Sequence, residues 1–241
     1  MKFNFKNKTL LITGGLGDFG KVIVKKFIDL GCKVIITTTN KNKEKNSKKI
    51  KIFYLDFRNE NSINEFEKKI RNIKKIDYLI NNAGINILDS IYNIKKKNLL
   101  DITNINLVGP TWLTSIVAAK MKKNRSGKII NISSIYGTVG KEKRSLYSIT
   151  KFGLIGLTKS SSLDLAKFNI LVNSISPGVF NTKLTKKILK KNGMKKIKLK
   201  IPLKKLGNPE SLANLCIFLC SNYNNYITGQ NIIIDGGYTS Y

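Results

Sequence analysis

The chain has 241 residues, of which 41% are hydrophobic, and its formal net charge is +30 at pH 7. This length and apolar content are typical of one well-buried globular domain. No apolar run approaches the ~20 residues that a membrane-spanning helix needs. The N-terminal segment also lacks the apolar stretch of a signal peptide, so we expect a cytoplasmic protein without membrane contact.

The basic residues argue against a nucleic-acid partner. Only four of the 44 lysines and arginines are arginine, the residue that readers of bases and phosphates favour. The lysines form no recognised binding motif, and a codon bias toward A and T accounts for their number. The three cysteines, at 32, 216 and 220, lack the spacing of a metal site, so we expect reduced thiols and no bound metal.

Apolar runs of strand length alternate with amphipathic segments of helix length along the whole chain. The expected strands cover residues 9–15, 33–38, 51–57, 76–84, 127–134, 170–178 and 231–237. The expected helices cover residues 17–31, 62–73, 98–122, 145–168 and 209–221.

Capping residues sharpen the start of two of these helices. Ser62 is expected to cap the second helix, with Glu65 three residues on completing a capping box. Asn208 is expected to cap the last helix, with Pro209 at its first position.

Apolar strands that alternate with helices predict a doubly wound parallel α/β sheet of the Rossmann type, with helices on both faces. No linker, repeat or low-complexity break interrupts the pattern, so residues 1–241 are expected to form a single domain. Ligands of such sheets bind beyond the carboxyl ends of the strands. The residues at strand ends are therefore the candidates for function.

The first two strand ends indicate a dinucleotide. The first runs into TGGLGDFG, residues 13–20, a glycine-rich turn that opens a helix and suits a pyrophosphate. The second ends in TTTN, residues 37–40, and no carboxylate follows until Glu44. Enzymes that select NAD usually place a carboxylate here for the ribose 2′-hydroxyl, so its absence favours NADP(H) over NAD(H).

The chain contains no histidine, the side chain that most often transfers protons near neutral pH. Tyr147 and Lys151, one helical turn apart, form a candidate acid–base pair, because a nearby ammonium lowers the pKa of a tyrosine from about 10. Tyr92 and Lys96 repeat the spacing, so spacing alone does not decide. Only the first pair follows a strand that ends in a hydroxyl residue, Ser134.

These residues, in this order and spacing, resemble the one-domain short-chain dehydrogenase/reductase family. The resemblance spans the whole chain and implies a homodimeric or homotetrameric NAD(P)-dependent oxidoreductase. It rests on Thr13, Gly14, Gly20, Asn81, Asn82, Ala83, Gly84, Asn106, Ser134, Tyr147, Lys151, Pro177 and Gly178.

The resemblance also implies roles for individual residues. Tyr147 is the expected general acid and base, Lys151 tunes it and binds the nicotinamide ribose, and Ser134 holds the substrate carbonyl. Asn106 is expected to support a water-linked proton path to the lysine. Cofactor contacts are expected at Gly14, Leu16, Phe19, Gly20, Thr38, Asp56, Phe57, Asn82, Ala83, Gly84, Tyr147, Lys151, Phe180 and Thr182. For Asn82 a second role, tying neighbouring strands together, is equally open.

Two features bear on this resemblance. Asp18 stands where the family usually has glycine, and we expect it to cap the helix while Gly17 supplies the flexibility of the turn. Residues 182–207 are expected to cover the active site, and their eleven lysines suggest an acidic or carrier-linked carbonyl substrate.

The substrate class stays open from the sequence. The length and the threonines after the second strand are similar to those of 3-oxoacyl-[acyl-carrier-protein] reductases. A sugar or polyol dehydrogenase of surface-glycan biosynthesis is the alternative, and a non-catalytic dinucleotide-binding regulator is the rival from another class.

Overall fold

The computed structural model describes residues 2–240, without the side chains of residues 184, 187, 188, 190 and 191. Its sheet has eight strands in the order β3-β4-β2-β1-β5-β6-β7-β8. The strands are β1 (Thr9–Ile12), β2 (Lys33–Thr38), β3 (Lys45–Asn46), β4 (Ile50–Tyr54), β5 (Tyr78–Asn81), β6 (Gly127–Ile132), β7 (Ile170–Pro177) and β8 (Asn231–Ile234). The α-helices are α1 (Asp18–Asp29), α2 (Glu60–Arg71), α3 (Lys96–Thr103), α4 (Gly109–Asn124), α5 (Ser145–Ala166), α6 (Lys183–Lys200) and α7 (Pro209–Cys220).

The predicted α/β sheet is confirmed, and all seven predicted strands are present. Every pairing among these seven is parallel. The exception is β3, which the sequence did not predict and which pairs antiparallel with β4 at the edge of the sheet. Its two residues are both exposed, so it carries no apolar pattern that a sequence could reveal.

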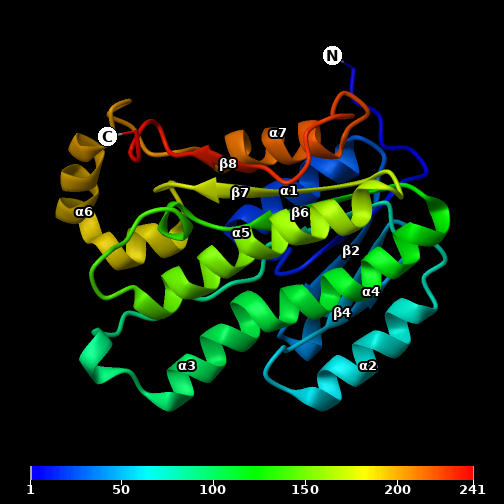
Figure 1. Ribbon diagram of the computed structural model, residues 1–241, viewed down its shortest axis with the longest axis horizontal. Helices are drawn as coiled ribbons and strands as arrows, with labels where there is room; N and C mark the ends of the chain where they lie inside the picture. The colour runs from blue at the N-terminus through cyan, green and yellow to red at the C-terminus, as the bar shows by residue number, and fades with distance from the viewer. Residues whose placement is uncertain (1, 241) are drawn as a thin grey trace.

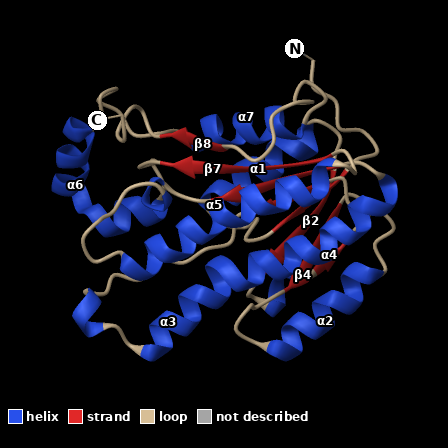
Figure 2. Ribbon diagram, in the orientation of Figure 1, coloured by secondary structure: helices blue, strands red, loops and turns tan. Residues whose placement is uncertain are grey.

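Helices cover both faces of this sheet, as Figures 1 and 2 show. On one face α1 and α7 bury residues such as Phe27 and Leu212 against Leu10 and Ile12 of β1. On the other face α2 and α4 pack over Leu11 of β1, and α5 lies against β7. Alternate residues of one strand thus enter two different cores, which explains why these strands read as continuous apolar runs.

The start of α2 differs from the expectation. Ser62 is not its cap, because the helix begins at Glu60 and the Asn59 side chain accepts the hydrogen bond of the Ser62 N–H at 2.9 Å. The Ser62 hydroxyl instead accepts from the backbone N–H of Asp56 at 2.9 Å. The cap predicted for α7 is confirmed: the Asn208 side chain accepts from the Glu210 N–H at 3.0 Å.

The helix expected over 98–122 is divided. A π-helical segment, Asn104–Val108, lies between α3 and α4. The wider turn carries Asn106, which is completely buried. Because π segments are rare and often mark functional positions, this interruption is relevant to the site.

Among residues 2–240, no helix combines the length and the apolar character that crossing a bilayer would require.

Candidate active site

The glycine-rich turn between β1 and α1 is tightly folded. Gly14 has φ +62°, a left-handed conformation that favours glycine. A Cβ on Gly20 would lie 2.4 Å from the carbonyl oxygen of Gly14, so only glycine lets α1 approach the turn this closely. Gly17 has an ordinary extended conformation, with φ −75°, and does not supply the flexibility expected of it.

Asp18 is the first residue of α1, and the N-cap position belongs to Gly17. The expectation that Asp18 caps the helix is therefore wrong, because the cap is the residue before it. The carboxylate still lies in the first turn, where the partial positive charge of the helix terminus favours an acid.

A cavity of about 650 Å³ runs along the carboxyl ends of the strands. Its volume is within the range of pockets that hold organic cofactors. Among the residues expected to bind a dinucleotide or act in catalysis, it is lined by Gly14, Leu16, Phe19, Thr38, Asp56, Phe57, Asn82, Ala83, Gly84, Ser134, Tyr147, Lys151 and Thr182.

Three expected site residues lie behind the wall of this cavity. Gly20 is buried in the packing of α1 against the turn. The Phe180 ring is only 2% exposed and packs edge-on against Phe19, so it belongs to the core and to a neighbouring pocket. Asn106 is buried beneath the loop that follows β5.

The end of the cavity near β2 and β4 is lined by hydroxyl groups and by a carboxylate–guanidinium pair. Thr38 and Thr39 line it, and the Thr37 hydroxyl accepts from the Gly14 N–H at 3.4 Å. Asp56 faces Arg58, whose guanidinium donates to both carboxylate oxygens at 3.0 and 2.7 Å. This contact lowers the pKa of Asp56, which is thereby held as a paired anion.

Two asparagines shape the middle of the cavity. The Asn82 amide donates to the carbonyl oxygens of Thr13 at 2.9 Å and of Gly14 at 3.1 Å. Asn82 therefore ties the end of β5 to the glycine turn as well as lining the cavity. Asn106 accepts from the Ile85 N–H and donates to the Ile85 carbonyl, both at 2.8 Å. It thus holds the loop after β5 in place.

Ser134, Tyr147 and Lys151 meet at the carboxyl end of β6. Ser134 caps a short 3₁₀ turn, Ile135–Gly137, and its hydroxyl accepts from the Tyr136 N–H at 3.2 Å. The Tyr147 and Ser134 hydroxyls share a hydrogen bond. Lys151 donates from Nζ to the carbonyl oxygen of Ile132 at 2.9 Å. Residues from β6 and α5 are thus brought together in one wall of the cavity.

The electrostatics of this group differ from the expectation. Burial raises the pKa of Tyr147, and the hydrogen bond to Ser134 offsets this only in part. The predicted lowering of the Tyr147 pKa by Lys151 is therefore wrong for this arrangement, in which the Lys151 amino group lies 5.6 Å from the Tyr147 ring centre. Burial lowers the pKa of Lys151 to about 8.

The second copy of the spacing is separated from this site. Tyr92 lies in a 3₁₀ turn and is 90% exposed, whereas Lys96 begins α3. The pair does not share one helix, and neither residue lines the cavity.

A smaller pocket of about 350 Å³ adjoins the cavity and shares Ser134, Tyr147 and Thr182 with it. Helix α6 forms one wall, so residues 182–207 do lie beside the site. Three of their eleven lysines, at 187, 190 and 191, have side chains outside the described part of the chain. The described lining carries four cations and no carboxylate: Lys141, Arg144, Lys196 and Lys200.

Sequence reasoning missed two residues of the site. Arg58 was not expected in it, although it stands two positions after Asp56, a spacing at which the pair can meet around a turn. Asn86 lines both pockets, and its buried side-chain oxygen has no hydrogen-bond partner among the described residues. No sequence signal marked Asn86.

The glycine turn, the cavity and the Ser–Tyr–Lys group can be compared with known proteins. A family model described as enoyl-(acyl carrier protein) reductase matches residues 17–239. The 3-oxoacyl-[acyl-carrier-protein] reductase FabG of Aquifex aeolicus (strain VF5) is 38% identical over 250 aligned residues, covering 98% of this chain and 99% of that protein. The chain belongs to the short-chain dehydrogenase/reductase family.

Two solved structures of similar proteins hold nicotinamide dinucleotides. ElxO with NADP bound has a TM-score of 0.89 and 33% identity, and the match covers 97% of this chain and 99% of that one. The 4-hydroxyisoleucine dehydrogenase complexed with NADH has a TM-score of 0.91 and 32% identity, with coverage of 98% and 100%. The predicted family and fold are confirmed. As a short-chain dehydrogenase/reductase the chain is an oxidoreductase, and the reading as a non-catalytic regulator is not supported.

Proposed function

We propose that this short-chain dehydrogenase/reductase reduces the 3-oxo group of an acyl chain carried by acyl carrier protein, with NADPH preferred over NADH. The observation that carries the proposal is the position of Ser134 and Tyr147, which line both the cofactor-sized cavity and the cationic pocket beside it. A reacting carbonyl group has to lie where these two spaces meet.

The residues present fit a nicotinamide dinucleotide. The close approach of α1 to the Gly14 turn suits a pyrophosphate at the helix terminus, and the cavity extends from there to Thr182. Gly14, Leu16 and Phe19 would hold the pyrophosphate end, and Asp56 with Phe57 the adenine. When bound, this cofactor supplies the hydride of the reduction.

The side chains of the site supply the remaining chemistry. The Ser134 oxygen accepts a hydrogen bond from the Tyr136 N–H, and its own proton, which is shared with Tyr147, can turn to a bound substrate carbonyl oxygen and polarise the carbonyl. Tyr147 then gives its proton to the same oxygen and completes the alcohol. Its raised pKa keeps it protonated at neutral pH, the form that a reductase needs.

Lys151 lies beside Tyr147 in the wall of the cavity. With a pKa of about 8, it is protonated in most molecules at neutral pH. Its amino group, 5.6 Å from the tyrosine ring centre, would bind the nicotinamide ribose, the second role that the family resemblance implies for it. Asn106 is a positioning residue, because it holds the loop at Ile85, and the water-linked proton path expected for it stays a prediction.

The preference for NADPH rests on the end of β2. Thr38 and Thr39 line the cavity there and offer hydroxyl donors with no unpaired carboxylate beside them in the described lining. The nearby carboxylate of Asp56 is paired with Arg58 and does not repel a phosphate as a free carboxylate would. The named relatives support this proposal in part, since one holds NADP and another NADH.

A direct assay tests the function. Acetoacetyl-acyl carrier protein, acetoacetyl-CoA and a panel of keto-sugars are compared as substrates, each with NADPH and with NADH. We expect the highest kcat/KM with the carrier-linked substrate and NADPH. Faster reduction of keto-sugars would instead establish the sugar dehydrogenase alternative. A Thr38→Asp variant, which introduces a carboxylate at β2, should shift the preference toward NADH.

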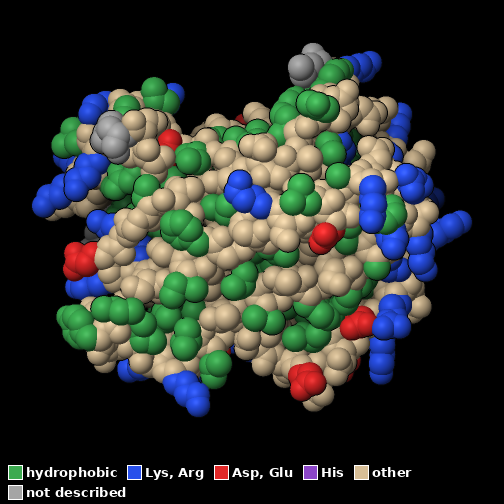
Figure 3. All heavy atoms as spheres, viewed as in Figure 1, with side chains coloured by type: hydrophobic (Ala, Val, Ile, Leu, Met, Phe, Trp, Pro, Cys, Tyr) green, Lys and Arg blue, Asp and Glu red, His purple; other side chains and the backbone are tan. Residues whose placement is uncertain are grey.

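We also propose that the protein forms a homodimer or homotetramer in the cytoplasm. Large apolar side chains are exposed on α3, α5 and the π segment between α3 and α4, and Figure 3 shows hydrophobic atoms in this region. A second copy would bury them. Light scattering after gel filtration would show whether Leu163→Glu and Phe152→Glu reduce the mass to that of one chain. The exposed apolar side chains of α3, the π segment and α5 are Leu99, Leu100, Val108, Ile149, Phe152 and Leu163.

A further inference from the structure

Another cavity of the described structure lies away from the active site. It has a volume of about 840 Å³ and shares no lining residue with the cofactor-sized cavity. Thr9 and Lys33, the first residues of β1 and β2, lie in its wall. Because parallel strands all run the same way, this cavity and the active site lie at opposite edges of the sheet.

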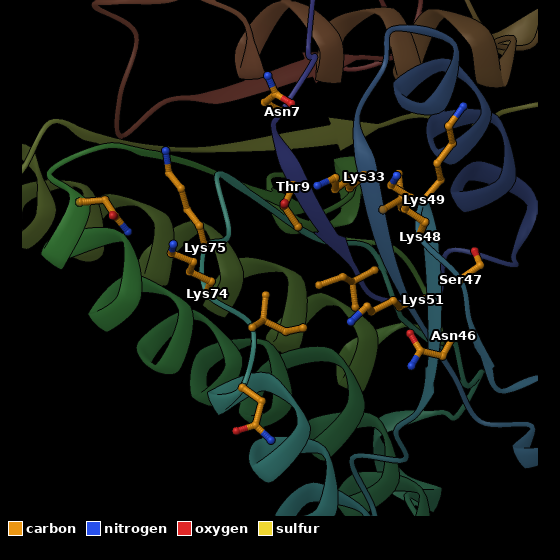
Figure 4. A pocket seen from close by; sticks show the side chains of 15 residues that line it. Asn7, Thr9, Lys33, Asn46, Ser47, Lys48, Lys49, Lys51, Lys74 and Lys75 are labelled. Atoms are coloured by element: carbon orange, nitrogen blue, oxygen red, sulfur yellow. The ribbon is translucent and has the colours of Figure 1, made fainter.

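Six lysines line this cavity, which we call the lysine pocket. Figure 4 shows Lys74 and Lys75, from the loop after α2, on one wall. On the facing wall the amino groups of Lys33 and Lys51 point across the pocket toward them. The remaining two, Lys48 and Lys49, come from the loop between β3 and β4.

The lysine content exceeds what composition explains. Six of the 15 lining residues are lysine, against 40 in 241 for the chain, after four arginines are subtracted from 44. No carboxylate lines the pocket. In Figure 3 Lys and Arg side chains crowd the edge of the molecule at the right, where the strands begin.

Most of this charge is uncompensated within the protein. Lys75 lies 3.1 Å from Asp77, which also contacts Lys8, so that one lysine is paired. The other five lysines of the pocket form no ion pair with any described residue. Like charges closer than the ~8 Å screening length at physiological salt repel one another, and a bound anion would relieve this.

The rest of the lining also suits a small polar ligand. The volume lies within the range of small-molecule pockets, about 300–1,000 Å³. Uncharged hydrogen-bonding groups lie among the lysines, and Ile73 adds apolar surface. Lysine ammonium groups bind phosphate oxygens as point charges with three donors each. The uncharged hydrogen-bonding residues that line the pocket are Asn7, Thr9, Asn46, Ser47, Asn72 and Asn124.

We propose that the lysine pocket binds a small polyphosphate anion, either a nucleoside triphosphate or an inorganic oligophosphate. Both present a chain of phosphates that can contact lysines from the two facing walls at once. The site is distinct from the cofactor-sized cavity and does not depend on the proposed reductase activity.

Calorimetric titration tests this proposal. The full-length protein, held in saturating NADP⁺ to occupy the cofactor-sized cavity, is titrated at low salt with sodium tripolyphosphate, with ATP and with adenosine. We expect one tripolyphosphate or ATP bound per chain and no binding of adenosine. Equal affinities for tripolyphosphate and ATP would show that the pocket recognises the phosphate chain alone. Tighter binding of ATP would show that the pocket also contacts the nucleoside.

Matched variants locate the site. The triple variant Lys33→Gln/Lys51→Gln/Lys74→Gln should bind at least about tenfold more weakly, because three facing charges are lost. Lys33→Arg/Lys51→Arg/Lys74→Arg keeps the charges and should bind within about twofold of the parent. A control of equal net charge, Lys2→Gln/Lys21→Gln/Lys123→Gln, changes exposed lysines outside the pocket and should also bind normally.

Two results would overturn the proposal. One is no binding of either phosphate compound to the parent protein. The other is an equal loss in the pocket variant and the control, which would show that only the diffuse net charge attracts the anion. If NADP⁺ itself does not bind, the variants still separate the two cavities, because these have no residue in common.

Discussion

Tyr147 and Lys151 lie one turn apart on α5 but have different hydrogen-bond partners. The Tyr147 hydroxyl is bonded to Ser134, whereas the Lys151 amino group donates to the Ile132 carbonyl at 2.9 Å. The serine therefore contacts the tyrosine directly, whereas the lysine is bonded to the end of β6, with its amino group 5.6 Å from the tyrosine ring centre.

Replacing Tyr147 by phenylalanine should abolish turnover while the nicotinamide cofactor still binds. The proton donor is lost, and general acid catalysis is worth about 10²–10⁴ in rate. Steady-state rates, together with cofactor fluorescence titration, measure the two effects separately. Tyr92→Phe is the matched control, because Tyr92 has the same spacing to a lysine but is exposed and outside the site. Turnover retained by Tyr147→Phe would refute the assignment.

Burial of Lys151 should make stability depend on pH between about 8 and 10.5. Below pH 8 the lysine is charged in both states, and the folded state carries the full cost of burying that charge. Between its folded pKa of about 8 and its ordinary value of 10.5, only the unfolded chain keeps the proton, so the free energy of unfolding rises with pH. The whole change is about 3 kcal/mol.

Urea unfolding at several pH values would measure this effect. Lys151→Met, which has no titratable group, serves as the reference, because subtracting it cancels the other lysines. Between pH 8 and 10.5 the free energy of unfolding of the parent protein should rise relative to that of Lys151→Met. A difference that stays constant over this range would contradict the buried, charged lysine described here.

Gly20→Ala should destabilise the protein and weaken cofactor binding. The new Cβ would lie 2.4 Å from the Gly14 carbonyl oxygen and 2.6 Å from the Gly15 Cα, so α1 would have to shift. Such overpacking costs about 1–3 kcal/mol. Gly17→Ala is the control, since its Cβ would meet nothing closer than 3.3 Å and its φ is −75°. Thermal unfolding and NADPH titration should separate the two variants; identical behaviour would count against the tight turn.

Reduction of an anionic, carrier-linked substrate should slow as salt is added. The pocket beside the site is lined by Lys141, Arg144 and Lys196, and salt screens their attraction for an acidic partner. We expect kcat/KM for acetoacetyl-acyl carrier protein to fall between 50 and 500 mM salt, roughly within one to two orders of magnitude. A small neutral ketone should show no such trend. A flat response with the carrier substrate would remove the electrostatic role of the pocket.

The three cysteines should not react with thiol reagents in the folded protein. Cys32, Cys216 and Cys220 are free and at most 2% exposed. Burial raises the pKa of Cys32 and of Cys216 to about 12, so almost no thiolate is present at pH 8. Colorimetric thiol titration should detect no fast-reacting group in buffer and three groups in guanidinium. Rapid labelling of the native protein would show that the core around α7 opens.

Local patterns in the sequence determined the order of the elements and the place of the site. Apolar runs marked the parallel strands, because a strand buried on both faces has apolar residues at consecutive positions, without alternating polar ones. The strand ends then placed Gly14, Asp56 and Ser134 along one edge of the sheet. The choice of Tyr147 over Tyr92 also came from sequence, through the strand that precedes it.

Only the tertiary structure decided which groups touch. It gave the capping of α2 to Asn59, placed Asn106 against Ile85, and set Arg58 on Asp56. It also raised the pKa of Tyr147, where the sequence had predicted the opposite. Periodicity and spacing report the neighbours of a residue along its own helix or strand. Burial and hydrogen-bond partners depend on segments far away in the chain, so they are settled only when the sheet and its helices pack together.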